Sequence, residues 1–395
     1  MHWRAPLLAA SVLVSGIPAV YGWGAAGHEI VATIAQIHLH STVLPKICTI
    51  LNFTSNNPDE PQCHLAPIAT WADRIRYKMR WSAGLHYIGA VGDHPQDKCL
   101  YPGERGWAGH PGGNVLGGIR NTTGILKDWV TQGEGTYNET ANEALKFLVH
   151  FLGDMHMPLH LTGRDRGGNS VKVTFDGRQT NLHSAWDSLL VAKAVRTVPA
   201  KYNHPLPNRQ IEHNLRGAIY DSFVRKVMWE GVLGKWHGDV EQWLACPARS
   251  GPVIGYMLPH WAQVAFGGRS GRVARLVQQV FGHAYVDIGA PEMMDDEILC
   301  PYHWSQPIHA LNCKLVWPKE IDEPPYSHAG SDEELNPRVP LLELDTPKYA
   351  GVVEKGWVLE ELMAQAGIRL AGVLNWLFMD PVEGEPSGPA LTINL

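Results

Sequence analysis

Charged side chains are scarce in this sequence of 395 residues: Asp, Glu, Lys and Arg make up 18% of it, against roughly 25% in an ordinary soluble domain. The 33 basic residues are outnumbered by 39 acidic ones, and no run of five like charges occurs. This composition argues against the broad basic surface of proteins that hold nucleic acid by charge alone. Because 45% of the residues are hydrophobic, a disordered chain is excluded as well.

Several familiar sequence signals are also missing. The chain contains neither a G-x-S-x-G elbow nor a Walker loop, which argues against a serine hydrolase and a P-loop nucleotide-binding protein. Gly and Pro follow no repeating period, which excludes repeat and collagen-like architectures. The longest apolar helix pattern, about Trp357 to Phe378, contains Glu360, Glu361 and Arg369 and therefore predicts a core helix. We expect no membrane attachment.

The first 22 residues have the features of a secretory signal peptide. Arg4 precedes an apolar stretch from Ala5 to Val20, and small residues lead to a cleavage point after Gly22. An N-terminal anchor is the alternative, but the stretch is short for a membrane span and is interrupted by Ser, Gly and Pro. We therefore expect a secreted, extracellular mature chain, residues 23–395. Three sequons predict N-glycosylation at Asn52, Asn121 and Asn138.

The six cysteines of an exported chain predict disulfide bonds, although six cysteines allow many pairings. Short spacing favours two local bonds and leaves one long-range bond; the favoured pairs are Cys48–Cys63, Cys300–Cys313 and Cys99–Cys246. A zinc site formed by Cys300, His303, His309 and Cys313 is the less favoured alternative, because the compartment is oxidising.

The pattern of apolar residues predicts the fold class. From Trp23 to about Tyr285 they recur at intervals of three and four, which is typical of helices. One alternating run over residues 171–175, followed by Asp176-Gly177, predicts a β-hairpin. Residues 288–345 are acidic and rich in Pro, and we expect an extended surface segment there. The final helix would complete a single domain that is all-α with a small β-hairpin.

The strongest chemical signal is the string HFLGDMHMPLH. Its His150 and Asp154 are four residues apart and share one helix face, a spacing suited to metal ligands, whereas His160 lies beyond the expected helix end. His183 and Asp187 repeat the four-residue spacing. Surface ion pairs are the alternative. Both pairs lie among apolar residues, however, where a divalent cation would offset the cost of burying carboxylates.

Further donor groups lie upstream. Asp73 and His86 offer another carboxylate and another imidazole. Signal cleavage would expose the Trp23 amine and carbonyl as metal donors, five residues before His28. His156 lies off the face of Asp154 and is a less favoured ligand.

Together these residues resemble the single-strand-specific zinc nucleases of the nuclease S-one and P-one type, which include the plant bifunctional nucleases. More distantly they resemble the bacterial zinc-dependent phospholipases C. The resemblance runs from Trp23 through the final helix, with residues 288–345 the poorest match. It rests on W-G-x-x-G-H, W-A-D, H-Y, H-x-x-x-D-x-x-x-P-L-H, G-G-N and H-x-x-W-D, in that order.

The resemblance implies three zinc ions. One zinc of a buried pair would be bound by Asp73, His86, His150 and a bridging Asp154. Its neighbour would be bound by the Trp23 amine and carbonyl, His28 and the same Asp154. The third, more exposed zinc would be bound by His160, His183 and Asp187. Asp187 replaces the Glu usual in the phospholipases, which favours a nuclease.

The resemblance also implies roles at the substrate. Asp73, Asp154 and Arg76 would be catalytic, with Arg76 holding phosphate, Tyr87 stacking a base and Asn169 contacting the substrate. The alternatives are an ordinary ion pair for Arg76, a core position for Tyr87 and a turn for Asn169. In the family, a carboxylate often occurs two residues after this aromatic residue. This chain has Gly89 at that position, and Asp93 is a candidate to take its place.

We therefore expect a secreted zinc endonuclease that hydrolyses single-stranded DNA and RNA to 5'-phosphorylated products, by attack of a hydroxide shared by two zincs. It would also release phosphate from 3'-mononucleotides, and we expect a monomer. Phosphate affinity would be concentrated at the metals, with a weaker salt dependence than in a basic-groove binder. The alternatives are a zinc phospholipase C and a non-catalytic extracellular binding protein stabilised by zinc.

Overall fold

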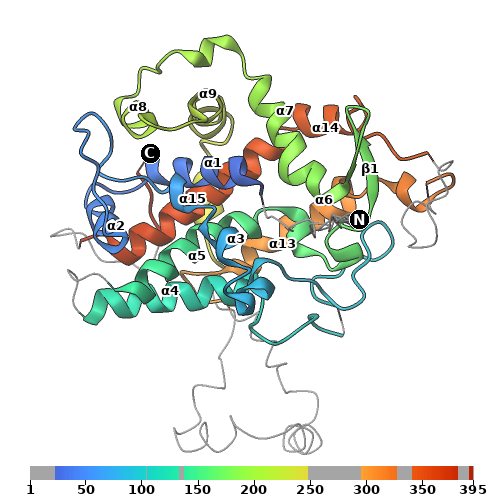
Figure 1. Ribbon diagram of the computed structural model, residues 1–395, viewed down its shortest axis with the longest axis horizontal. Coiled ribbons are helices and arrows are strands. Elements are labelled where there is room, and N and C mark those ends of the chain that lie inside the picture. Colours follow the sequence, from blue (N-terminus) through green and yellow to red (C-terminus); the bar gives the residue numbers. More distant parts are fainter. Residues whose placement is uncertain are drawn as a thin grey trace, which may run out of the picture.

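The computed structural model describes residues 23–103, 105–132, 138–247, 295–326, 340–380 and 391–394; the predicted signal peptide lies outside these ranges. Figure 1 shows a mainly helical chain with one two-stranded hairpin, which confirms the predicted fold class. The α-helices of the described residues are α1 (Ala25–Ile37), α2 (Val43–Leu51), α3 (Trp71–Ile75), α4 (Val115–Gln132), α5 (Glu139–Met155), α6 (Leu182–Ser184), α7 (Val191–Arg196), α8 (Arg209–Leu215), α9 (Asp221–Lys226), α10 (Val240–Leu244), α13 (Pro301–Leu311), α14 (Ala350–Lys355) and α15 (Val358–Phe378).

The predicted final helix, α15, lies at the centre of the core. It packs against α1, α4, α5 and α10, and in Figure 1 it runs through the middle of the molecule beside α1. Two of its charged residues are buried and partnered: Glu360 pairs with Lys226, and Arg369 donates to the Trp243 carbonyl. Within the described residues, no helix is long and apolar enough to cross a membrane.

Helix α5 carries the strongest sequence motif. Asn138 caps its start, because the side chain accepts a hydrogen bond from the Ala141 amide at 3.1 Å. Leu145, Leu148 and Leu152 lie on its buried face. The helix ends at Met155, and a 3₁₀ turn, η3 (Pro158–Leu161), follows. His150 and Asp154 therefore share the last two turns of α5, whereas His160 belongs to the next element.

The hairpin leads into the second motif. β1 (Lys172–Phe175) pairs antiparallel with β2 (Arg178–Asn181), and Val173 and Phe175 are buried. Asp176 and Gly177 form the turn with φ values of 53° and 70°. Because α6 begins directly after β2, the hairpin determines where His183 enters the core.

The described part of residues 288–345 is not an extended surface segment, and that expectation was wrong there. Residues 301–311 form α13, whose Trp304 and Ile308 are buried, and Trp317 and Leu344 are also buried. Pro301 occupies the first turn of α13, where no intrahelical amide bond is lost, and the helix also contains Pro307 in its interior.

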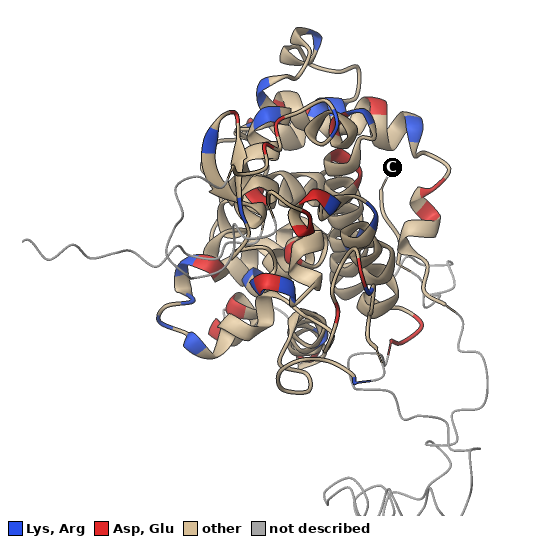
Figure 2. Cartoon of the chain, turned by 90° about the vertical axis from the view of Figure 1, so that its right-hand side faces the viewer, with Lys and Arg blue, Asp and Glu red and all other residues tan. Residues whose placement is uncertain are grey.

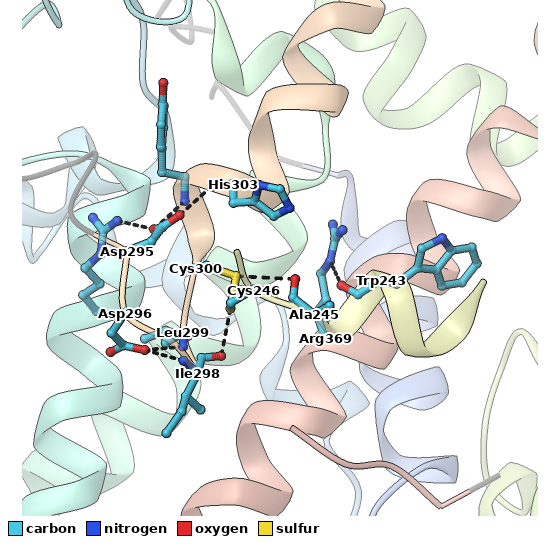
Figure 3. Close-up of a disulfide and its surroundings, with 12 residues drawn as sticks. Trp243, Ala245, Cys246, Asp295, Asp296, Ile298, Leu299, Cys300, His303 and Arg369 are labelled. Carbon is cyan, nitrogen blue, oxygen red and sulfur yellow. Dashed lines mark hydrogen bonds and ion pairs between the residues drawn. A yellow bond between two sulfur atoms is a disulfide. The ribbon is translucent and has the colours of Figure 1, made fainter. Parts of the chain in front are cut away.

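The disulfide bonds correct two of the three favoured pairings. Cys48–Cys63 is confirmed, but the other bonds are Cys99–Cys313 and Cys246–Cys300. Figure 3 shows Cys246, which follows α10, joined to Cys300 at the start of α13. Sequence spacing failed here because the packing of α13, and not chain proximity, decides which cysteines meet. Since Cys300 and Cys313 are both oxidised, the alternative zinc site is excluded.

The three predicted glycosylation asparagines are all exposed. Asn52 follows α2, Asn121 lies within α4 and Asn138 caps α5. In Figure 2, basic and acidic residues are interspersed over the side of the molecule that is shown. That distribution agrees with the absence of long runs of like charge in the sequence.

Candidate metal centre

Five buried side chains from four elements meet beside α5. His28 comes from α1, Asp73 from α3 and His86 from the end of a 3₁₀ helix, η2 (Arg80–His86), while His150 and Asp154 come from α5. They form two overlapping groups whose ligand atoms lie within 4.8 Å of one another; we call them the paired groups, His28/His150/Asp154 and Asp73/His86/His150.

Asp154 occupies the middle of this arrangement. Its carboxylate oxygens lie 2.9 Å from His86 Nδ1, 3.2 Å from His150 Nε2 and 3.4 Å from His28 Nε2. A fourth imidazole, His160, approaches to 3.5 Å. One carboxylate thus faces four histidines, so neighbouring ions held by these histidines could share it.

The paired groups depend on a close approach of α1 to α5. The rings of His28 and His150 stack with centroids 3.8 Å apart. Gly153 makes room for this contact, since a Cβ atom at that position would lie 2.5 Å from His28 Nδ1. A side chain at position 153 would displace His28 from Asp154.

A third group, His160/His183/Asp187, lies on shorter elements. His160 belongs to η3, His183 to α6 and Asp187 to a π-helical turn, η5 (Ala185–Leu190). His183 Nε2 lies 3.1 Å from Asp187 Oδ2, and the rings of His160 and His183 stack at 5.1 Å. All three residues are buried. We refer to this set as the third group.

Backbone carbonyls orient three of the imidazoles. The Nδ1 atoms of His150, His160 and His183 lie 2.7, 2.5 and 2.6 Å from the carbonyl oxygens of Ala69, His86 and Gly167. A carbonyl can only accept, so each Nδ1 carries a proton and each Nε2 is the ring nitrogen left to bind a metal. This is the usual outer arrangement around metal-ligating histidines.

The buried polar atoms of these groups that have no hydrogen-bond partner show whether the residues fit a metal ion. Buried atoms without a hydrogen-bond partner in the described residues include His28 Nε2, Asp73 Oδ1, His86 Nε2, Asp154 Oδ1, His160 Nε2 and Asp187 Oδ1. Native proteins rarely bury so many unsatisfied acceptors in one place, because each costs about 1–3 kcal/mol. Divalent cations would satisfy them and balance three buried carboxylates, so the residues fit metal ions.

Burial and neighbouring charges shift the pKa values of four of these side chains in different directions. Burial opposes a charged His150, but Asp154 and Asp73 raise its pKa to about 9. Burial likewise opposes charge on Asp154, yet His150 and His160 hold its pKa well below the usual range. In the third group, burial raises the pKa of Asp187 to about 7. Burial also lowers the pKa of His160 to about 4.

Trp23 lies next to the third group. Its side chain is fully buried, and the following amide, that of Gly24, donates to the Asp187 carbonyl at 2.9 Å. The first predicted residue of the mature chain is therefore adjacent to the cluster. His156, the less favoured ligand, lies outside all three groups: Arg369 donates to its Nε2 at 2.8 Å and its Nδ1 contacts the Leu152 carbonyl.

The predicted substrate residues differ in exposure. Tyr87, beside His86, is 51% exposed, so the alternative of a core tyrosine was wrong. Arg76 is half-buried at the end of α3. Asn169 is half-buried and its side-chain amide donates to the Arg166 carbonyl at 2.8 Å, as expected of a turn residue.

Asp93 does not replace the missing carboxylate at Gly89. Asp93 is buried, and its carboxylate already accepts from Leu100, Thr162 and His309. A side chain at Gly89 would meet the Gly163 amide nitrogen at 2.6 Å, because the two backbones are in close contact. The local packing explains why this chain has glycine at that position.

Sequence reasoning missed the residues that hold the third group in place. The Gly167 carbonyl that contacts His183 belongs to a left-handed turn, residues 165–168, whose φ values are 46°, 58°, 63° and 79°. The buried Arg164 precedes the turn; it donates to the Pro95 carbonyl at 2.5 Å, pairs with Asp322 and lies 4.2 Å over the Trp317 ring. The sequence Arg-Asp-Arg-Gly-Gly at residues 164–168 could have indicated this turn. The residues that Arg164 contacts are distant in sequence, however, so the sequence alone did not reveal its role.

Comparison with known proteins agrees with the geometry. The S1/P1 Nuclease family model matches residues 23–245. Endonuclease 1 of Arabidopsis thaliana is 30% identical over 385 residues, which cover 95% of this chain and 94% of that protein. Endonuclease 2 of the same plant is 31% identical over 242 residues, 60% of this chain and 73% of that protein. Nuclease S1 of Aspergillus oryzae is 36% identical over 191 residues, 48% of this chain and 61% of that protein. Because the family model covers more than half of the sequence and includes every residue of the three buried groups, the chain belongs to the S1/P1 nuclease family of hydrolases that act on phosphodiester bonds.

Proposed function

We propose that this chain is a secreted, zinc-dependent endonuclease that cleaves single-stranded DNA and RNA to 5'-phosphorylated products and also acts as a 3'-nucleotidase. The observation that carries the proposal is the meeting of three buried His/Asp groups, with their acceptor atoms unsatisfied, in a member of a nuclease family. The mature domain would comprise residues 23–395, with glycans at the three exposed sequons.

The metal ligands in this proposal are the nine residues that the sequence predicts. Asp73, His86, His150 and Asp154 would hold one zinc, and Asp154, His28 and the Trp23 amine and carbonyl its neighbour. His160, His183 and Asp187 would hold the third. Support comes from the carbonyl contacts that turn three Nε2 atoms inward and from the central position of Asp154. The chemistry that zinc supplies when bound is a water of lowered pKa for attack on phosphorus and positive charge for the leaving oxygen.

The remaining residues would bind and orient the substrate. Arg76, which directly follows α3, would contact a phosphate oxygen, and the exposed ring of Tyr87 would stack a base. Asn169 would accept or donate at the substrate from the turn beside His183. The burial of Asp73 and Asp154 would keep bulk water away from these ligands.

The proposal is tested on the secreted protein by N-terminal sequencing, metal counting and activity assays. We expect a chain that starts at Trp23, three zincs per molecule, and release of phosphate from a 3'-mononucleotide that stops after exhaustive chelation. Full activity on oligonucleotides after chelation would overturn the proposal. Hydrolysis of a choline phospholipid without action on nucleotides would instead favour a phospholipase C, and zinc binding without either activity a binding protein.

A further inference from the structure

We propose that residues 74–81 form a docking surface for single-stranded nucleic acid beside the metal centre. The inference rests on the proposed nuclease function and deepens it, because it assigns a site to the part of the strand beyond the scissile phosphate. We call these residues the 74–81 strip. Its charged and aromatic side chains, all exposed or half-buried, are Arg74, Arg76, Tyr77, Lys78, Arg80 and Trp81.

The strip lies between two residues of the paired groups. Asp73, in α3, directly precedes it, and η2 continues from it to His86. Trp81 is five residues before His86, which corresponds to about 10 Å along a 3₁₀ helix. The strip therefore begins directly after one residue of the paired groups and continues through η2 to another.

The strip carries a net positive charge, whereas the whole chain carries a net negative charge. Four basic side chains occur within residues 74–80, at alternate positions, and no acidic residue occurs between positions 74 and 92, although the whole chain has a net charge of -6. Within the described residues, no carboxylate forms an ion pair with Lys78 or Arg80. Two carboxylates lie in the neighbourhood of the strip. Glu29 interacts electrostatically with Arg74, and Glu143 interacts with Lys146, which is itself near Arg74.

Large aromatic side chains alternate with these charges. Tyr77 is 70% and Trp81 65% exposed, among the most exposed large hydrophobic residues in the described part of the chain. Lys78 lies 5.8 Å from the Tyr77 ring. Contiguous exposed apolar patches often mark interaction sites, and every nucleic acid base offers a π-face to stack on an aromatic ring.

One of the two aromatic rings of the strip, that of Trp81, packs against the body of the protein. One side of Trp81 packs on Phe147 at 5.7 Å, and Phe147 lies one turn before His150 on α5. The buried Ser82 donates its hydroxyl to the Met79 carbonyl at 2.8 Å and so fixes the backbone turn. A rigid ring loses little entropy on binding, which suits it for stacking.

Charge and ring chemistry together identify the occupant. Phosphates of a strand would meet Lys78 and Arg80, and its unpaired bases would stack on Tyr77 and Trp81. In a duplex the bases are already paired and stacked, so it would gain only the charge contacts. The strip thus favours single strands longer than one nucleotide.

The test compares two variants, Tyr77→Ala/Trp81→Ala and Lys78→Gln/Arg80→Gln, with the wild-type holoenzyme. A matched control is Trp229→Ala, which removes an exposed aromatic residue from another part of the surface. Binding of a fluorescein-labelled, nuclease-resistant phosphorothioate 15-mer is measured by anisotropy, and hydrolysis is measured on a 3'-mononucleotide. We expect binding of the 15-mer to weaken about tenfold for each aromatic residue removed. The charge variant should reduce the slope of log affinity against log salt by about 1.4, from two lost phosphate contacts.

Mononucleotide hydrolysis should stay within twofold of wild type in all variants, and the Trp229→Ala control should bind the 15-mer like wild type. Unchanged 15-mer binding in both strip variants would overturn the docking surface and leave the proposed nuclease function intact. Weakened 15-mer binding by the strip variants, together with a wild-type protein that does not hydrolyse the 3'-mononucleotide, would support the surface and overturn the nuclease function. Equal losses for the 15-mer and the mononucleotide would also overturn the proposal, because they would place the strip in the chemistry instead.

Discussion

The two parts of the metal centre are built in different ways. The paired groups take three of their five residues, His28, His150 and Asp154, from the long helices α1 and α5, which pack against each other and against α15. The third group takes its residues from η3, α6 and η5, which are short or irregular. Regular helices keep their ligands in place by their own hydrogen bonds, whereas the third group depends on the surrounding chain.

Arg164 is the clearest example of that dependence. The left-handed turn that it precedes contains Asp165 and Arg166, two residues with a Cβ atom and positive φ, which is unfavourable for each. The contacts of Arg164 with Pro95, Asp322 and Trp317 hold the turn so that the Gly167 carbonyl reaches His183. The comparison teaches that neighbouring sites in one cluster can differ in how many distant residues they require.

The largest expected effect comes from Asp154, because it faces both paired groups and His160. Asp154→Asn should lower kcat by about 10³-fold or more and reduce the zinc content by at least one ion. Steady-state kinetics and metal analysis measure both. Asp176→Asn, at the exposed hairpin turn, is the matched control. Retention of three zincs and wild-type kcat would refute the bridging role of Asp154.

A smaller effect is expected when only the third group is damaged. Asp187→Asn should remove one zinc and lower kcat by about 10²-fold, because the paired groups retain their ligands. Metal analysis distinguishes the result from that of Asp154→Asn. Loss of all three ions would show that the two parts of the centre are not independent.

Arg164→Met tests the distant support of the third group. We expect affinity for one zinc to fall about 50-fold while the other two stay bound, since outer contacts of ligands typically contribute 10- to 100-fold. Titration with a competing chelator measures the three affinities. Arg178→Met, in the exposed β2 strand, removes the same charge without these contacts. Equal weakening of all three ions would contradict a local role for Arg164.

The smallest effect concerns the scaffold of the paired groups. His38 ends α1, contacts the Asn394 carbonyl through Nδ1 at 2.7 Å, and burial lowers its pKa to about 4. The unfolded chain therefore binds more protons than the folded one between pH 6.5 and 4, so stability falls as the pH falls through this window. From pH 7 to pH 5, the lowered pKa of His38 should decrease the free energy of unfolding by about 2 kcal/mol. Denaturant unfolding at both pH values measures this decrease. It should be correspondingly smaller in His38→Gln than in the wild type, and an identical decrease in both would exclude His38 as the cause.

Much of the cluster could be predicted because its signals are local. The four-residue spacing in α5 and in the segment from His183 to Asp187 places each pair on one face whatever the rest of the chain does. The resemblance to the nuclease family then connected these pairs with Asp73, His86 and His28. The same local logic failed for Cys300 and Cys313, which are near in sequence but bonded to distant partners.

The sequence by itself determined the helical class, the hairpin and the donor residues, because helix periodicity, turn chemistry and ligand spacing act over a few residues. Only the tertiary structure decided that one carboxylate faces four imidazoles, that Asp93 is occupied by Thr162 and His309, and that residues 301–311 form a core helix. Those outcomes depend on contacts between segments up to about two hundred residues apart, whose packing energy no local pattern encodes.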